Sequence, residues 1–233
     1  MISLTKNPEA EFEKQRFWLA LAKSVILALL IALPFLFNDI FSFRWEQFGL
    51  RPRTTEGLFG IVSMHFLHSN IEHLFGNLLP LLFLSFGLFY FFPGKAFIIH
   101  ILLAISTGVL TWVIGVQGNH IGASGLVYAL AFFLVVISLI KMESSLLAYT
   151  LIIIFLYGSM VWGFFPQLFP DKHISWEGHL AGAISGVIAA FYYRKEGPQQ
   201  REYFVDEEEE YRGTEHGEKP HFNYKTTSYV TNL

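Results

Sequence analysis

The sequence contains no cysteine and little charge: only 15% of its 233 residues are Asp, Glu, Lys or Arg. The absence of cysteine excludes disulfide bonds, cysteine nucleophiles and thiolate metal sites. The formal net charge is −3, so no excess of basic residues points to a nucleic-acid partner. What the chain has instead is apolar, since 53% of its residues are hydrophobic and 25 are phenylalanine. This composition is typical of a protein with several lipid-facing helices.

Six apolar runs are long enough to cross a lipid bilayer, which takes roughly 20 residues. They are continuous and do not alternate with polar residues as barrel strands do, so they predict helices. No small-residue cleavage site follows the first run, which favours a retained span over a signal peptide. We therefore expect an all-α, polytopic membrane protein with six transmembrane helices, at about 17–38, 72–92, 95–116, 123–141, 145–165 and 178–194.

Lysine and arginine predict the orientation of these helices. Eight of the 16 flank the first run, fall in connections between spans or follow the last span, all on the side that the positive-inside rule assigns to the cytoplasm. These residues are Lys6, Lys14, Arg16, Lys23, Lys95, Lys141, Arg194 and Lys195. The loop after the first run goes against this assignment, since it carries Arg44, Arg51 and Arg53. With both termini cytoplasmic, we expect an N-terminal segment (1–16), a six-helix domain (17–195) and an acidic, disordered tail (196–233).

Polar residues stand at the beginnings of three predicted spans, where lipid makes ionisable groups costly and marks them as functional candidates. The second run opens with His73 and Asn77, the fourth with Ser124 and Tyr128, and the sixth with His179. The two members of each pair are one helical turn apart and share a helix face. Because the second, fourth and sixth helices run in the same direction, all five residues lie toward the non-cytoplasmic side.

The depth of Ser124 can be estimated from Lys141, which we take to mark the inner surface of the membrane. Ser124 precedes Lys141 by 17 residues, which is about 25 Å of helix at 1.5 Å per residue. The hydrocarbon core is about 30 Å thick, so the serine would lie several ångströms below the outer surface. Irregular backbone at that depth is allowed only where it lines a water-filled cavity. The sequence thus predicts a submerged, wet pocket.

Small residues would let the fourth and sixth helices approach each other closely. The run from Gly122 to Gly125 presents a flat surface, and Gly182 and Gly186 form a GxxxG pair on the face that carries His179. We therefore expect the seryl hydroxyl and the imidazole to come within hydrogen-bond distance.

This combination of residues indicates nucleophilic catalysis. A serine hydroxyl is a weak nucleophile until a base takes its proton, and histidine is the base suited to neutral pH. The tetrahedral intermediate needs preorganised donors, and the amide of Ser124, the carboxamide of Asn77 and the ring of His73 could supply them. No carboxylate obviously completes a triad, because Glu177 lies two residues from His179 on the same helix and would not face it.

Three motifs resemble those of the rhomboid family of intramembrane serine proteases. They are HLFGN at 73–77, GASG at 122–125 with a tyrosine four residues after its serine, and HLAGAISG at 179–186. Each motif alone is weak, but here they come in order and open the second, fourth and sixth of six helices. The resemblance extends over residues 15–195, approximately the whole predicted helical domain.

The resemblance implies a six-helix core in which Ser124 is the nucleophile and His179 the general base and acid. The oxyanion hole would be lined by Asn77, His73 and the serine amide. The site would be supported by Tyr128, Gly122, Gly125, Gly182 and Gly186.

The resemblance also implies the surroundings of the site. The partners would be the lipid bilayer and transmembrane protein substrates, cleaved near small residues where their helix is locally weak. The fifth helix and the loop before His179 would form a lateral gate and a cap. The location would be a bacterial inner membrane, and no cofactor, metal ion or nucleic acid is expected.

One position departs from the family pattern. Many members carry a Trp-Arg pair about thirteen residues before the first motif histidine, where this chain has Phe59 and Gly60. This puts the stabilisation of the first loop in doubt. Elsewhere, His100 stands alone in the third run and is expected to be a hydrogen-bonded core residue.

Three other interpretations remain open. His65, His68 and His73 could bind a metal ion, although no Glu-x-x-His pair or second histidine box accompanies them. The chain could be an inactive relative that binds transmembrane segments, although such relatives usually lack the serine or the histidine. Asp171 could swing in as a third triad member, but we favour a dyad in which Tyr128 packs on the imidazole.

Overall fold

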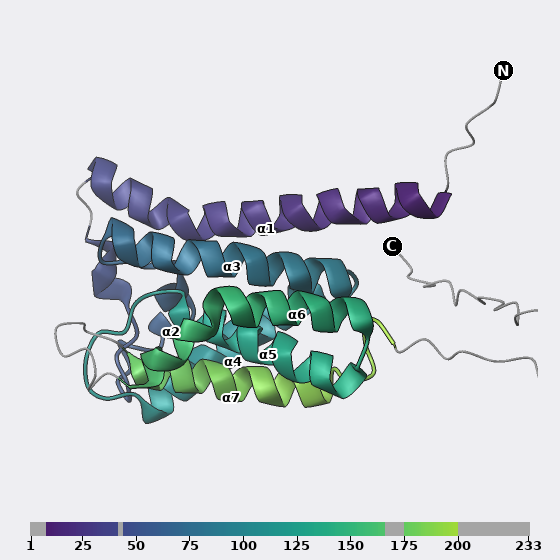
Figure 1. Ribbon diagram of the computed structural model, residues 1–233. Helices are drawn as coiled ribbons and strands as arrows, with labels where there is room; N and C mark the ends of the chain where they lie inside the picture. Colours follow the sequence, from purple (N-terminus) through teal and green to yellow (C-terminus); the bar gives the residue numbers. More distant parts are fainter. Residues whose placement is uncertain (1–7, 42–43, 166–174, 200–233) are drawn as a thin grey trace, which may run out of the picture.

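The computed structural model describes residues 8–41, 44–165 and 175–199, whose regular structure is helical, without a β-strand (Figure 1). The predicted all-α fold is confirmed. The α-helices of these ranges are α1 (Pro8–Phe41), α2 (Gly60–Ser63), α3 (Ile71–Phe91), α4 (Ala96–Ile114), α5 (Ser124–Lys141), α6 (Ser144–Tyr157) and α7 (Trp176–Tyr192). Three 3-10 helices accompany them: η1 (Trp45–Phe48), η2 (Met64–Phe66) and η3 (Gly158–Phe164).

Five helical segments are long and apolar enough to cross a membrane, and they correspond to the first five predicted spans. They are Pro8–Phe37, Ile71–Phe91, Ala96–Ile114, Ser124–Lys141 and Ser144–Phe164. The sixth predicted span corresponds to α7, which has 17 residues. That length stands at the lower limit of the range of about 17–25 residues for a spanning helix. The chain is therefore a multi-pass membrane protein.

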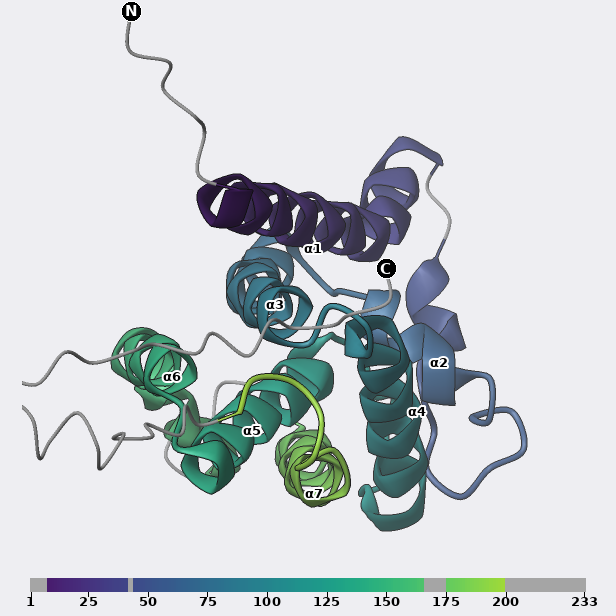
Figure 2. The ribbon, with the colours of Figure 1, turned by 90° about the vertical axis from the view of Figure 1, so that its right-hand side faces the viewer.

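The long helices lie side by side, with α5 in the middle of the bundle. Seen nearly along the helix axes, α5 is surrounded by α3, α4, α6 and α7 (Figure 2). α1 lies outside this group and packs chiefly on α3 (Figures 1 and 2). Accordingly, α5 is the most buried of the five candidate spans, while α6 and α1 are the least. The helix that begins with Ser124 thus forms the centre of the molecule.

Two helices begin or end at other residues than the apolar runs they correspond to. α1 begins at Pro8, ahead of the apolar run, because proline is favoured at the first helical position and Glu9 and Glu11 in the first turn suit the helix dipole. α6 ends at Tyr157 and continues as η3. Glycine at Gly158 and Gly163 lowers α-helix propensity there. The fifth apolar run is therefore not one continuous α-helix.

The core lies where α3, α4 and α5 meet, and it includes a hydrogen-bonded histidine. Leu88, Leu103 and Phe133 are fully buried in it. His100 donates from Nδ1 to the carbonyl of Ala96 (2.8 Å), and its Nε2 then accepts from the hydroxyl of Ser85 (2.9 Å). The expectation that His100 is a satisfied core histidine is confirmed.

Candidate active site

α5 and α7 are in direct backbone contact at two glycines of α7, as the GxxxG spacing predicts. A Cβ atom built on Gly182 would lie 2.0 Å from the carbonyl oxygen of Gly125. A Cβ atom on Gly186 would lie 2.2 Å from the carbonyl oxygen of Ala129. No real side chain tolerates such distances, so only glycine at both positions lets the two helices pack this closely.

This contact brings the beginnings of α5 and α7 together. Ser124 is the first residue of α5 and is half-buried, while His179 lies in the first turn of α7 and is buried. Their chain neighbours touch, because a Cβ atom on Gly125 would lie 3.1 Å from the carbonyl oxygen of Gly178. The hydrogen bonds of the described residues include none between the Ser124 hydroxyl and the His179 imidazole. The helices are thus brought together around the two residues, without a direct bond between their side chains.

Hydrogen bonding and stacking fix the imidazole of His179 in one tautomer and one plane. Its Nδ1 lies 2.9 Å from the carbonyl oxygen of Gly163, which can only accept, so Nδ1 carries the proton. In the neutral ring, Nε2 is then left with a free lone pair. The ring stacks on Tyr128 with a centroid separation of 4.1 Å and an interplanar angle of 9°. The hydroxyl of Tyr128 donates in turn to the carbonyl of Met160.

The segment η3 therefore supplies two backbone acceptors to the site, which sequence reasoning missed. Gly163 also needs to be glycine, since a Cβ atom there would lie 2.1 Å from the Tyr128 hydroxyl and 2.9 Å from Nδ1 of His179. The signal that could have found it is a glycine that interrupts the fifth apolar run. Nothing in the sequence marks the carbonyl of Met160.

The side chains of α3 meet the turn that precedes Ser124. Gly122 has a φ of +118°, a region that favours glycine, and a Cβ atom there would lie 2.6 Å from Nε2 of His73. The same Cβ atom would lie 3.5 Å from Nδ2 of Asn77. Nδ2 of Asn77 is buried and has no hydrogen-bond partner among the described residues. Nδ1 of His73 lies 3.3 Å from the hydroxyl of Ser69. Two side-chain nitrogens of α3 thus lie beside the turn.

Residues of η2 and of its connection to α3 support the same turn from the other direction. The N–H of Gly122 donates to the carbonyl of Met64 (2.9 Å), and the N–H of Ala123 donates to Nε2 of His68 (3.4 Å). Burial in this environment lowers the pKa of His68 to about 3, so its ring is neutral and Nε2 is able to accept. The sequence offered His68 only as a metal ligand, and its contact with the turn was not foreseen.

Of the two carboxylates weighed as a third catalytic member, only Glu177 lies among the described residues, and no hydrogen bond joins it to His179. The one hydrogen bond of its imidazole among the described residues goes to the backbone carbonyl of Gly163. Glu177 is buried at the start of α7. Asp171 lies outside the described residues, and so does most of the loop that was expected to act as a cap.

The histidines weighed as metal ligands have separate partners. Nε2 of His65 donates to the carbonyl of Ala104 (3.0 Å), Nε2 of His68 accepts from Ala123, and His73 lies against Ser69. In the part of the chain that the structure describes, no three His, Cys, Asp or Glu side chains are grouped closely enough to hold a metal ion. The geometry of these residues does not favour the metal interpretation.

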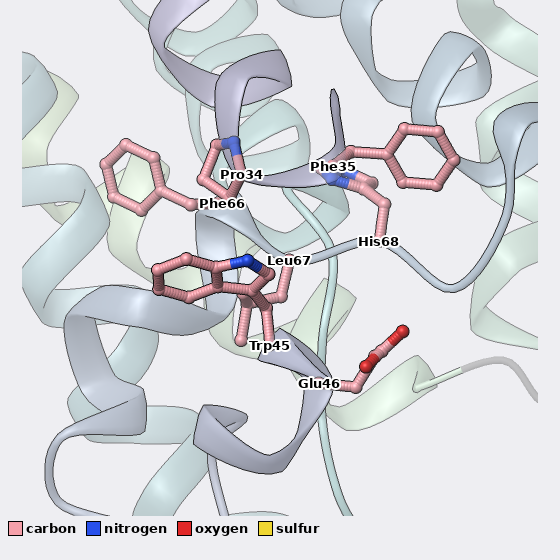
Figure 3. Close-up of a pocket in the computed structure, with 7 residues that line it drawn as sticks. All are labelled: Pro34, Phe35, Trp45, Glu46, Phe66, Leu67 and His68. Carbon is pink, nitrogen blue, oxygen red and sulfur yellow. The ribbon is translucent and has the colours of Figure 1, made fainter. Parts of the chain in front are cut away.

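A small hollow on the molecule lies apart from this site (Figure 3). It is formed between α1, η1 and η2, and shares only His68 with the residues described above. It is lined by Pro34, Phe35, Trp45, Glu46, Phe66, Leu67 and His68. Since it includes neither Ser124 nor His179, we do not take it as the candidate active site.

The first loop is anchored by backbone contact at the position where the family pattern differs. A Cβ atom on Gly60 would lie 2.2 Å from the Cα atom of Leu50, so the backbones touch. Leu50 is itself paired with His120 through two backbone hydrogen bonds of 2.9 and 2.8 Å. Phe59 is 66% exposed and meets Phe48 edge to face, with ring centroids 6.0 Å apart. A glycine at position 60 thus allows a contact that arginine would prevent.

The spans and their arrangement define the class of the molecule as a multi-pass integral membrane protein with an all-helical fold. Comparison with known families matches the Rhomboid domain over residues 55–196. This range contains all the candidate site residues and covers more than half of the chain, so the chain belongs to the rhomboid family.

Curated relatives of similar length occur in mycobacteria. The chain is 33% identical to uncharacterized protein Rv1337 of Mycobacterium tuberculosis over 198 residues, which is 80% of each chain. It is 32% identical to uncharacterized protein ML1171 of Mycobacterium leprae over 197 residues, 81% of this chain and 78% of the relative. These relatives align with the chain over most of its length, and both are described as uncharacterized.

Proposed function

We propose that this chain is an intramembrane serine endopeptidase that cleaves transmembrane segments of other membrane proteins with a dyad of Ser124 and His179. The observation that carries the proposal is the hydrogen bond between Nδ1 of His179 and the carbonyl of Gly163 (2.9 Å). It leaves Nε2 unprotonated at the start of α7, where the backbone contact between Gly125 and Gly178 brings α5 alongside. A neutral imidazole with a fixed tautomer is what a serine nucleophile needs as its base.

The reaction would follow the acyl-enzyme route. Nε2 of His179 takes the proton of Ser124 while Oγ attacks the scissile carbonyl carbon and forms a tetrahedral intermediate. When the carbon–nitrogen bond breaks, the imidazolium returns its proton to the leaving amine. Water then attacks the acyl-enzyme with the same histidine as base, which releases the carboxyl product and restores the serine. A small approach of the two side chains would complete the hydrogen bond, since such bonds often tighten only when substrate is bound.

The oxyanion hole would be formed by donors that converge on the turn before α5. Nδ2 of Asn77 is buried and has no partner within the described part of the chain, which is costly for a polar group unless a ligand atom accepts its hydrogen bond. Nε2 of His73 and the N–H of Ser124 would be the other donors. Gly122, where a Cβ atom would lie 2.6 Å from Nε2 of His73, keeps this space open.

Removing the carboxamide of Asn77 is expected to lower kcat by about 10²–10³-fold, the range found when one oxyanion-hole donor is lost. KM should change little, because the donor acts mainly on the charge that develops in the transition state. The measurement is the rate of cleavage of a reconstituted transmembrane substrate by Asn77→Ala and Asn77→Asp. The aspartate variant keeps the shape of the side chain but not its donor, so full activity in Asn77→Asp would contradict the role.

The substrate would enter from the lipid beside α6. This helix is the least buried of the candidate spans, which supports its proposed role as a lateral gate. The substrates would be transmembrane segments with small residues near the scissile bond and a locally weak helix. No cofactor or metal ion takes part in the proposed reaction.

We further propose that the chain resides in a bacterial inner membrane with both termini cytoplasmic. The mycobacterial relatives are in keeping with a bacterial protein. Lys141 and Arg194 lie at the ends of α5 and α7 opposite to the site, where Nζ of Lys141 donates to the carbonyl of Arg194 (2.9 Å). Basic residues at this end agree with the positive-inside rule. The division into segments 1–16, 17–195 and 196–233 stays a prediction.

The test is to reconstitute the purified chain into liposomes with a single-span protein that carries small residues in the outer part of its span. We expect two fragments whose new termini lie within the span, and undiminished cleavage in the presence of EDTA. Loss of cleavage on chelation would favour a metal mechanism. Capture of the intact substrate without any cleavage would favour an inactive, binding member of the family.

A further inference from the structure

A hydrogen bond between two side chains joins the segment leading to Ser124 with the segment leading to His179. Nδ1 of His120 lies 2.6 Å from the hydroxyl of Ser175, although 55 residues separate the two in sequence. His120 belongs to the connection between α4 and α5, and Ser175 is the residue that precedes α7. Neither residue belongs to the proposed dyad or to its oxyanion donors.

The direction of this bond follows from the other ring nitrogen. Nε2 of His120 lies 2.8 Å from the carbonyl oxygen of Val116, which can only accept, so Nε2 carries the ring proton. In the neutral ring, Nδ1 is therefore the acceptor, and the hydroxyl of Ser175 is the donor. His120 is half-buried, and because both of its ring nitrogens are hydrogen-bonded, the orientation of its ring is fixed.

His120 is also held through its backbone, and so is the chain that follows it. Its N–H donates to the carbonyl of Leu50 (2.8 Å), and its carbonyl accepts from the N–H of Leu50 (2.9 Å). Ser124 stands four residues further along the chain. The histidine thus forms a fixed point immediately ahead of the turn that carries the proposed nucleophile.

Ser175 stands in the equivalent place relative to the proposed base. Its carbonyl accepts a hydrogen bond from the N–H of His179 (3.3 Å) in the first turn of α7. Its hydroxyl oxygen lies close to α7, since a Cβ atom on Gly178 would be 3.0 Å away from it. A displacement of Ser175 would therefore move the start of α7 and with it the imidazole.

We propose that His120 and Ser175 are positioning residues that set the separation of Ser124 and His179. This inference rests on the proposed function and adds to it a link between the two catalytic segments at their entry points. The GxxxG contact holds α5 and α7 together further along their length, but the side chains at their first residues need a second constraint. The hydrogen bond between His120 and Ser175 supplies it.

The test measures the rate at which a fluorophosphonate modifies Ser124 in the purified full-length chain, together with kcat and KM for a transmembrane substrate. Ser175→Ala removes the donor, and Ser175→Thr keeps it as the conservative control. We expect Ser175→Ala to lower the labelling rate and kcat by roughly 10–10²-fold, the effect of a misplacement on the order of 1 Å. KM should stay near that of the wild type, and Ser175→Thr should restore most of the rate.

Two variants of the histidine separate the role of Nδ1 from that of the rest of the ring. The side-chain oxygen of asparagine comes near the position of Nδ1, whereas the amide of glutamine reaches the position of Nε2. His120→Asn can therefore keep the bond to Ser175, and His120→Gln keeps only the bond to Val116. We expect His120→Asn to retain more activity than His120→Gln. Equal losses, or the reverse order, would overturn the proposal even if Ser175→Ala failed to fold.

A double variant provides the remaining check. If the two residues act through one bond, Ser175→Ala combined with His120→Gln should be no slower than the slower single variant. Losses that multiply would show independent roles and contradict the proposal, as would wild-type labelling by Ser175→Ala. Absence of labelling in the wild-type chain would instead refute the proposed function itself, so the two failures are distinguishable.

Discussion

Replacing Ser124 with alanine is expected to abolish cleavage of a transmembrane substrate while leaving the fold and substrate capture intact. The proposed mechanism has no other nucleophile, and loss of the serine in a serine protease costs about 10⁶-fold in kcat. The side chain is half-buried at the first turn of α5 and makes no hydrogen bond to the His179 imidazole, so its hydroxyl contributes little to folding. The measurement is the amount of cleaved substrate in liposomes after long incubation.

Ser138→Ala is the matched control for this experiment. Ser138 lies on the same helix and is fully buried, and among the described residues its hydroxyl bonds only to the carbonyl of Val135 (2.8 Å) in that helix. Its removal should leave cleavage close to the wild-type rate. If Ser124→Ala cleaves at the wild-type rate as well, Ser124 is not the nucleophile.

Replacing Gly182 with alanine is expected to produce a large loss of stability for the addition of a single methyl group. The new Cβ atom would lie 2.0 Å from the carbonyl oxygen of Gly125 and 3.1 Å from the amide nitrogen of Ala129. Both are backbone atoms of α5, so relief requires the whole helix to move. Overpacking of this kind costs about 1–3 kcal/mol in well-packed interiors. It should also separate Ser124 from His179 and slow substrate cleavage.

Gly76→Ala is the matched control for stability. Gly76 lies within α3, but a Cβ atom there would meet nothing within 4 Å. In an open helical position, alanine stabilises by about 0.5–1 kcal/mol relative to glycine. Both substitutions add one methyl group, but only the methyl group at Gly182 meets backbone atoms. The two variants should therefore shift the thermal unfolding midpoint in detergent in opposite directions. An unfolding midpoint for Gly182→Ala at or above that of the wild type would contradict the close contact of α5 and α7.

Much of the helical architecture could be predicted because lipid imposes strong rules on sequence. A span must be long and apolar, so the positions of five spans follow from the runs themselves. Close packing in lipid needs small residues, so the GxxxG pair at Gly182 and Gly186 indicates which face of α7 meets α5. Polar residues at the starts of spans indicated that α3, α5 and α7 carry the site, and the structure brings the first turns of these helices together at one end of the bundle.

The contacts that hold the site in place could not be predicted, because they join backbone atoms to side chains distant in sequence. The carbonyls of Met160 and Gly163 bind Tyr128 and His179 only because the fifth apolar run changes from α6 to a 3-10 helix. Hydropathy does not register such a change, since the residues stay apolar. In the same way, nothing near His68 in sequence indicates that its ring receives the N–H of Ala123.

The most direct test of the central claim, that His179 activates Ser124 as a nucleophile, is covalent labelling of the detergent-solubilised chain with a fluorophosphonate, followed by mass spectrometry. It needs no knowledge of the physiological substrate. We predict a single modified residue, Ser124, and loss of the modification in His179→Ala under conditions where that variant remains folded. Labelling of Ser124 at the wild-type rate in His179→Ala, or no labelling of Ser124 in the wild-type chain, would contradict the account.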